Sequence, residues 1–555
     1  MTWKKADCDK RFGALVSNHY KFNTAYKVLS DYINPTRGIF NGDRNKIGSM
    51  IDHKTLISSH GTHALRIFAS GMNSGMTNKS SNWFRLTFDN IAYLDVMGAK
   101  EWLDSVQDTM YAVINKSNLY EAFYTCYEEL GQFGTGCYLI LEDYEDVIRA
   151  RSFTAGEYYL ATNNKGRVDT FGREFQMTVS QLVQEFGYES CSSVVQSYYT
   201  NKQYDITISV RHMIQPNSYK VEGYEDRANM EYISLYWECG QSSENFLAIR
   251  GYRKFCVVSP RWEAPTTDSV YGYGPGWHAI GAVKELQKTR KDKLIAQEKL
   301  HNPPMLEDSS VEGSSNYLPG GITKSSAAVP NAGVRPAYQI NPAIDSFIQA
   351  MQELKEDIDR FFFVNLFLML MNIDKTNMTA TEVAERQQEK IMMMGPALHR
   401  LDEEMLTPTL EIVFAIMEDN GMIPPAPQGI QDLEIKIEFT SILAQAQRAL
   451  GVTKIERVFT FAGAVAPMIP DILDVLNADE AIRLIGDLEG APAKILKDKE
   501  TVDDLREARQ KNQQMMMAMQ AANNAADTTK KLADSKMVEP SALTGIMSGI
   551  QGGSK

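Results

Sequence analysis

The 555-residue sequence contains no paired cysteine motif. Its six cysteines lie far apart and none forms a C-x-x-C pair, which favours reduced thiols over a disulfide or zinc framework. The first residues lack the apolar core of a signal peptide, so we expect cytoplasmic synthesis without export. The longest apolar run, residues 361–371, is too short for a membrane span, which needs about 20 residues. We therefore expect no membrane partner.

Recognisable catalytic motifs are also missing. The sequence has no phosphate-binding loop ending in Gly-Lys-Ser/Thr, no H-E-x-x-H and no G-x-S-x-G. His60 and His63 have the spacing of a shared metal site on a helix, but no cysteine or acidic ligand accompanies them. The acidic runs 142–146 and 402–404 are typical of a solvated surface. We expect no catalytic residues, no cofactor and no metal.

Basic residues are fewer than acidic residues in this sequence. The chain has 57 Lys plus Arg against 70 Asp plus Glu, a net charge of −13, so its surface as a whole repels nucleic acid. The exception is residues 278–300, with six bases and three acids and a basic face formed by Lys284, Lys288 and Lys291. Residues 344–371 have two bases and five acids. Two interpretations fit equally: pairing within the chain, or contact of the basic helix with acidic helices of neighbouring copies or with a polyanion.

Apolar spacing separates helical from strand-forming regions. Apolar residues that recur every three or four positions predict helices. These helices are expected at 11–33, at 54–70 with an end near Gly71, over most of 92–130, and at 179–186. Stretches rich in β-branched and aromatic residues predict strands at 134–141, 158–160, 205–210, 231–237 and 433–439, with a hairpin turn at 163–166. The expected fold class is α+β and predominantly helical.

Two long helices are predicted on either side of a proline-rich stretch that cannot be helical. The second carries an apolar stripe for packing, formed by Phe347, Met351, Leu354, Ile358 and Phe361. Beyond it, Thr379 and Glu382 have the spacing of a capping box that starts a new helix. No aromatic residue follows Phe461, and the sequence after it favours a helical appendage with a loose end.

A series of short motifs follows in a characteristic order. They are Y-G-P-G at 273–276, K-E-L at 284–286, H-N-P-P-M at 301–305, M-T-A-T-E-V at 378–383, E-R at 385–386, G-P-A-L-H-R-L at 395–401 and E-M-L-T-P at 404–408. In order and separation they resemble the portal, or head-to-tail connector, proteins of short-tailed T7-like bacteriophages. The resemblance extends from about residue 10 to about residue 480.

The resemblance implies a portal fold that assembles into a ring of twelve copies at one capsid vertex. The regions it implies are an N-terminal helical segment (1–39), an α+β wing (40–275), a first stem helix (276–300), a clip (301–343), a second stem helix (344–372), a tunnel loop (373–378), helices and a strand returning to the wing (379–440), a helical crown (441–540) and a flexible tail (541–555).

The implied function is a channel for packaging, retention and ejection of double-stranded DNA, in a virion protein made in the host cytoplasm. The tunnel loop would bring Lys375, Thr376 and Asn377 nearest to the DNA. Implied partners are the major capsid protein, the terminase, a tail adaptor, and scaffold and internal core proteins. Two alternatives stay open at this point: a packaging motor subunit, which would be an enzyme, and a capsid or scaffold protein. A cellular adaptor is a third, with no motif in its favour.

Overall fold

The computed structural model describes most of the chain, which divides into two compact units, residues 1–477 and 478–555. The described residues are 3–40, 56–90, 93, 98–221, 223, 229–240, 245–307, 311, 334–336, 344–371, 393–427, 429–430, 433, 435–441, 443, 458–466, 475–489 and 499–534. The tunnel loop, the predicted cap at Thr379 and Glu382, the tail after 540 and most of the clip lie outside these residues.

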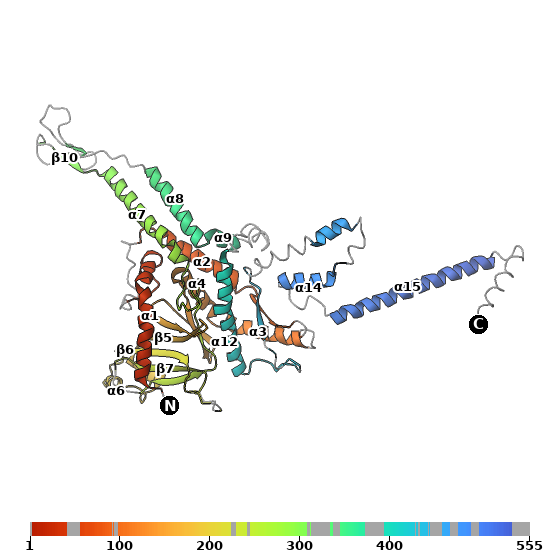
Figure 1. Cartoon of the computed structure of the whole chain (residues 1–555), viewed down its shortest axis with the longest axis horizontal. Helices are drawn as coiled ribbons and strands as arrows, with labels where there is room; N and C mark the ends of the chain where they lie inside the picture. Colours follow the sequence, from red (N-terminus) through yellow and green to blue (C-terminus); the bar gives the residue numbers. More distant parts are fainter. Residues whose placement is uncertain are drawn as a thin grey trace. The chain divides into compact units, whose positions relative to one another are not determined.

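Four helices lie among the described residues of the first 133 positions (Figure 1). They are α1 Lys5–Tyr32, α2 His60–Met76, α3 Ala99–Lys116 and α4 Leu119–Phe133. The prediction that the second helix ends near Gly71 is wrong, because α2 continues to Met76. Gly71 marks a close packing contact instead: a Cβ atom at this position would lie 2.2 Å from the ring of Phe367.

The strands form antiparallel sheets, in agreement with the α+β class that their β-branched and aromatic residues predict. A five-stranded sheet has the order β4-β5-β6-β7-β8, with bounds Tyr158–Thr162, Val168–Thr178, Thr207–Pro216, Tyr232–Glu238 and Ala248–Tyr252. A three-stranded sheet has the order β3-β2-β9, with bounds Val147–Phe153, Cys137–Asp143 and Val257–Val258. The predicted turn at 163–166 is confirmed between β4 and β5, and the predicted helix at 179–186 is confirmed as α5 Val179–Phe186. Helix α6, Ser193–Thr200, follows it.

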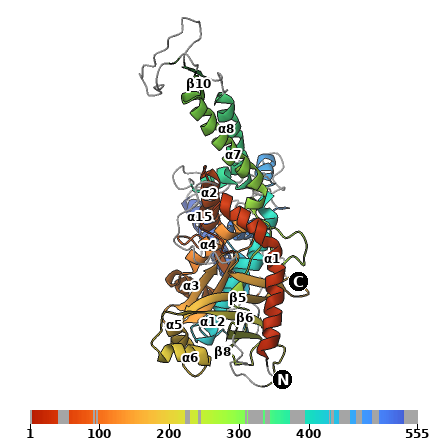
Figure 2. The same ribbon diagram turned by 90° about the vertical axis from the view of Figure 1, so that its left-hand side faces the viewer.

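Helix α1 covers one face of the five-stranded sheet (Figure 2). Phe12 of α1 lies edge-on to Trp237 of β7, and the Arg211 guanidinium of β6 lies 4.8 Å above the centre of the Phe12 ring. Gly172 of β5 faces Phe12, where a Cβ atom would come within 3.1 Å of the ring. Aromatic burial of this kind is a large stabilising term, so α1 shares a hydrophobic core with this sheet.

The two predicted long helices pack side by side and extend away from the body of the first unit (Figures 1 and 2). The first is α7 Pro275–His301, which begins with proline at its first position, where the missing amide proton costs nothing. A short ladder between β10 Met305–Glu307 and β11 Val334–Pro336 follows α7.

The second long helix is broken, so the prediction of one continuous helix over 344–372 is wrong. Helix α8 spans Ile344–Phe361 and α9 spans Val364–Met371. Between them Phe363 adopts a left-handed backbone conformation with φ of 54°. The break lets Phe362 and Phe367 both pack against Phe68 of α2, with ring centroids 6.3 and 5.7 Å apart. Burial of both rings outweighs the local helix propensity of this segment.

The later part of the first unit packs back against its N-terminal part. A π-helical turn, Asp402–Leu406, leads directly into α12 Thr407–Asp419. The predicted strand near 433–439 is confirmed as β12 Ile435–Phe439, which pairs with β1 Phe84–Phe88. Leu443 is buried close to Gly75 of α2, and the boundary between the two compact units falls after Asn477.

The second unit is helical in its described residues, with α14 Ala478–Glu489 and α15 Lys499–Asp534. Arg506 of α15 forms a bidentate ion pair with Asp479 of α14, at 2.5 and 2.7 Å. None of the described helices in either unit is long and apolar enough to cross a membrane.

Candidate functional site

The projecting pair of α7 and α8 is apolar at both ends but buried at only one. Near the body of the unit, Val283, Leu286 and Ile358 join the main hydrophobic core. Toward the far end of the pair, four aliphatic side chains are between 37% and 51% exposed: Leu294, Ile295, Leu300 and Ile348. A grouping of exposed aliphatic side chains on one projecting element marks an interaction surface.

The predicted apolar stripe of the second long helix lies mainly toward α7. Ile358 is fully buried, whereas Phe347, Met351 and Leu354 are half-buried. Phe361 is 40% exposed and stacks loosely beside His278 of α7, with ring centroids 6.4 Å apart. The adjacent Phe362, which was not part of the predicted stripe, is fully buried.

The three lysines predicted as a basic face, Lys284, Lys288 and Lys291, are all exposed on α7. The Lys284 ammonium lies 5.4 Å above the ring of Tyr32. Among the residues that the structure describes, none of the three forms an ion pair with an acid of α8. Asp357 pairs with Arg360 of its own helix, and Asp359 lies 2.9 Å from His60 of α2. The opposite charges of the two helices are thus not used to join them within the chain.

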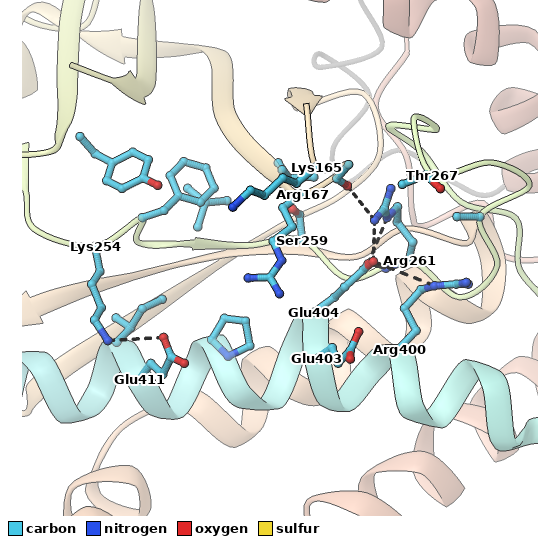
Figure 3. Close-up of a pocket in the computed structure, with 18 of the residues that line it drawn as sticks. Lys165, Arg167, Lys254, Ser259, Arg261, Thr267, Arg400, Glu403, Glu404 and Glu411 are labelled. Carbon is cyan, nitrogen blue, oxygen red and sulfur yellow. Dashed lines mark hydrogen bonds and ion pairs between the residues drawn. The ribbon is translucent and has the colours of Figure 1, made fainter. Parts of the chain in front are cut away.

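A second charged surface, the charged cleft, has a volume of about 770 Å³ (Figure 3). It lies between the β4–β5 turn, the segment that contains β9, and the first turns of α12. Its charged lining residues are Lys165, Arg167, Glu231, Arg253, Lys254, Arg261, Arg400, Glu403, Glu404 and Glu411.

The pair of Arg261 and Glu404 forms the buried end of the cleft. Arg261 is 6% exposed and donates from Nε at 3.0 Å and from Nη2 at 2.5 Å to the Glu404 carboxylate. Its backbone amide donates to the same carboxylate at 3.0 Å, and Nη2 also donates to the carbonyl oxygen of Gly166 at 3.1 Å. A guanidinium this buried needs an opposite charge in bidentate geometry, which the π-helical turn supplies. Glu404 is therefore a structural partner, not part of a solvated acidic run.

The remaining charges of the cleft lie nearer to solvent. Lys254 pairs with Glu411 at 3.4 Å, and Arg253 pairs with Asp419 at 2.8 Å, with all four side chains about half exposed. Such pairs contribute little to stability. The sequence revealed the β4–β5 turn and the acidic run 402–404 separately, but no pattern linked these distant segments into one surface.

Buried titratable groups in the described residues serve packing. Burial holds the pKa of His212 well below its ordinary value, and the imidazole stacks on Tyr236 with centroids 3.9 Å apart. Burial raises the pKa of the Cys126 and Cys137 thiols, which keeps both protonated and unreactive. No group of three His, Cys, Asp or Glu side chains able to hold a metal ion occurs within the described ranges.

One buried carboxyl group links helix to sheet. Glu129 of α4 is fully buried and accepts hydrogen bonds from the Thr154 hydroxyl at 2.7 Å and from the Ala155 amide at 3.0 Å. Burial raises the pKa of Glu129 to about 7. The group therefore changes charge near neutral pH, but Glu129 is not among the residues that line the charged cleft.

The DNA-channel candidates Lys375, Thr376 and Asn377, and the cap residues Thr379 and Glu382, lie outside the described residues. The structure thus tests neither their positions nor their contacts.

Known proteins similar to this chain match it over nearly its whole length. Residues 5–496 match the family described as "Bacteriophage head to tail connecting protein". The chain is 36% identical over 539 residues to a portal protein of Salmonella phage epsilon15, covering 97% of each chain. It is 37% identical over 545 residues to a probable portal protein of Bordetella phage BPP-1, covering 98% of each. A solved neck structure from an empty GTA particle is 12% identical and aligns with 82% of this chain and 97% of its own, at a TM-score of 0.36.

Proposed function

This chain belongs to the family of bacteriophage head to tail connecting proteins, and on that premise we propose that it acts as a portal protein whose copies close into a ring. Both phage relatives with portal names match it over almost their full length, which supports the same role at the junction of head and tail in the virion. The finer parts of this role, a ring of twelve copies and a channel for double-stranded DNA, are proposals.

The observation that carries ring assembly is the exposed apolar end of the α7–α8 pair. Leu294, Leu300 and Ile348 would be covered if the pair of one copy packed against that of the next. A contact between two different surfaces, repeated by a rotation that closes, produces a ring with a central opening. The unpaired lysines of α7 and the acids of α8 give such a contact opposite charges. We assign α7 and α8 to the stem of the ring.

DNA passage through such a ring requires weak binding. Each phosphate that a lysine neutralises adds salt-dependent affinity, and strong affinity would hold the duplex in place. A net charge of −13 suits a conduit of this kind. We propose Lys375, Thr376 and Asn377 as the residues nearest to DNA. The clip would contact the terminase and then a tail adaptor. The wing would contact the major capsid protein, and the crown would contact scaffold and internal core proteins.

Electron microscopy of the purified full-length protein tests the proposal. Negative-stain images are expected to show rings with a central pore, and native mass measurement is expected to give a mass near twelve times the monomer. A protein that stays monomeric at micromolar concentration would contradict ring assembly. An assay for ATP hydrolysis by the same preparation distinguishes a portal from a packaging motor, since only a motor would be active.

A further inference from the structure

Two cations of the charged cleft have no carboxylate partner among the described residues. Lys165 and Arg167 are exposed and lie between Lys254 and Arg261 in Figure 3. All four carboxylates of the cleft have a basic neighbour. The distances are 3.2 Å from Glu231 to Lys220, 3.7 Å from Glu403 to His399, 2.5 Å from Glu404 to Arg261, and 3.4 Å from Glu411 to Lys254. The charge left over in the cleft is therefore positive.

The turn that carries these two cations is rigid. The Asn163 side-chain oxygen accepts hydrogen bonds from the Lys165 amide at 2.9 Å and the Arg167 amide at 3.0 Å. Gly166 between them has φ of 74°, which favours glycine, and its carbonyl oxygen accepts from Arg261. The Arg261 side chain, which pairs with Glu404, thus holds the backbone of the turn through the Gly166 carbonyl. The backbone that carries both cations is therefore ordered before any ligand binds, which lowers the entropy cost of binding.

The size and walls of the cleft favour a short acidic segment of protein over nucleic acid. Its volume of about 770 Å³ accommodates a few side chains. The wall beside the cations contains Tyr232, Phe255, Pro408 and Ile412, which suit an aromatic ring. A duplex presents a continuous row of phosphates, which a cleft of this volume does not enclose, whereas one or two acidic side chains can reach Lys165 and Arg167.

The same chain displays an acidic and aromatic turn of this kind between β2 and β3. Tyr144 at its tip is 99% exposed, and the neighbouring Glu145 carboxylate forms no ion pair with any described residue. Asp143 stabilises the turn by accepting the Glu145 amide at 2.8 Å and the Asp146 amide at 3.3 Å. A tyrosine left wholly in water is a costly surface feature and a frequent anchor of protein interfaces.

The turn and the cleft are separate surfaces of the first unit. The cleft includes Val257 of the edge strand β9. The turn joins the central strand β2 to the other edge strand, β3, and Asp146 of the turn pairs with Lys116 of α3 at 3.4 Å. Two different surfaces on one chain are what a head-to-tail contact between copies requires.

We propose that the 143–146 turn of one copy docks in the charged cleft of a second copy. The Glu145 carboxylate then faces Lys165 and Arg167, and the Tyr144 ring lies against Tyr232 and Phe255. This inference rests on the proposed ring, and it names one contact that joins neighbouring copies in the wing.

Site-specific cross-linking in assembled full-length protein tests the contact. Tyr144 is replaced by the photoreactive residue benzoylphenylalanine, rings are isolated and irradiated, and cross-linked peptides are identified by mass spectrometry. The expected cross-links join two copies and end in the peptides that contain residues 165–167, 231–232, 253–267 or 403–412. Rings that give cross-links only elsewhere, or none, would overturn the docking while leaving the ring proposal intact. Wild-type protein that forms no ring would contradict the ring proposal itself.

A charge exchange provides the second test. The double substitution Lys165→Glu and Arg167→Glu, and separately Glu145→Lys, are each expected to weaken association between copies about tenfold or more. Combining Glu145→Lys with the double substitution is expected to restore most of the loss. Lys21→Glu, at an exposed position of α1, is the control and is expected to change nothing. Loss of association without restoration in the combined variant would count against direct contact.

Discussion

Gly71 of α2 and Phe367 of α9 are in such close contact that a Cβ atom on the glycine would lie 2.2 Å from the phenylalanine ring. The contact joins the helix that follows the break at Phe363 to the body of the unit. Side chains this closely packed cannot accept an extra methyl group without movement of the backbone. The position of α9 therefore depends on a glycine within α2.

Replacing Gly71 with alanine should displace α9. We expect Gly71→Ala to lower the free energy of unfolding by about 2 kcal/mol, despite the better helix propensity of alanine. Chemical denaturation of the full-length protein measures this effect. Gly13→Ala in α1 is the matched control, because a Cβ atom on Gly13 would meet no other atom within 4 Å, and this variant should become slightly more stable. Equal effects of the two substitutions would refute the packing argument.

Removing the charge of Glu404 should destabilise the cleft. Glu404→Gln leaves the Arg261 guanidinium nearly buried without an opposite charge, at a cost on the order of 3 kcal/mol. Glu411→Gln on the same helical segment breaks an exposed pair with Lys254 and should cost less than about 1 kcal/mol. Urea denaturation of both variants gives the comparison. A loss for Glu411→Gln as large as that for Glu404→Gln would argue against the buried pair.

Glu129 should make stability depend on pH. Its pKa is raised to about 7 by burial, above the ordinary value of 4.5, so the folded protein retains a proton that the unfolded chain releases. This contribution to stability is present below about pH 4.5 and is lost as pH rises to about 7, by up to about 3 kcal/mol. Unfolding free energies of wild type and Glu129→Gln are measured at pH 5 and pH 8. The advantage of wild type over the variant should shrink at pH 8, and parallel pH profiles would exclude this role.

Charge placed on the far end of the helix pair should prevent ring assembly. The double substitution Leu294→Asp and Leu300→Asp changes two side chains that are about half exposed in the single chain, so the protomer should still fold. Native mass measurement is expected to find monomers, and their far-UV circular dichroism spectrum should match that of wild type. Ile249→Asp, at a position that is 44% exposed on β8, is the control for adding an acid elsewhere. Intact rings in the double variant would contradict the proposed stem contact.

Reversing one charge in the predicted tunnel loop should affect DNA and not assembly. Lys375→Glu adds repulsion toward phosphates in each copy, so packaging or retention of DNA should change while ring formation does not. Packaged genome length and native mass are the two measurements. Lys10→Glu, at an exposed position of α1, controls for the change in net charge. Loss of the ring in Lys375→Glu would refute this separation of roles.

Local patterns identified many of the elements. The hairpin turn at 163–166 was predictable because Asn163 and Gly166 supply the side-chain acceptor and the positive φ that a tight turn needs. The strand at Ile435–Phe439 followed from simple alternation. Predictions failed where distant residues intervene: Gly71 was interpreted as a helix end, and the segment before Met371 as one continuous helix. In both cases the deciding contact is with a side chain that lies hundreds of residues away in the sequence.

The sequence by itself determined the class of the protein, its two long helices with their proline-rich connection, and the resemblance to portal proteins, because periodicity and motif order are local properties of the chain. Tertiary structure alone decided the break at Phe363, the burial of Phe362 in place of Phe361, and the charged cleft that joins Lys165, Arg261 and Glu404. Ion pairs and aromatic contacts act over a few ångströms between segments that only folding brings together, so their partners cannot be read from local spacing.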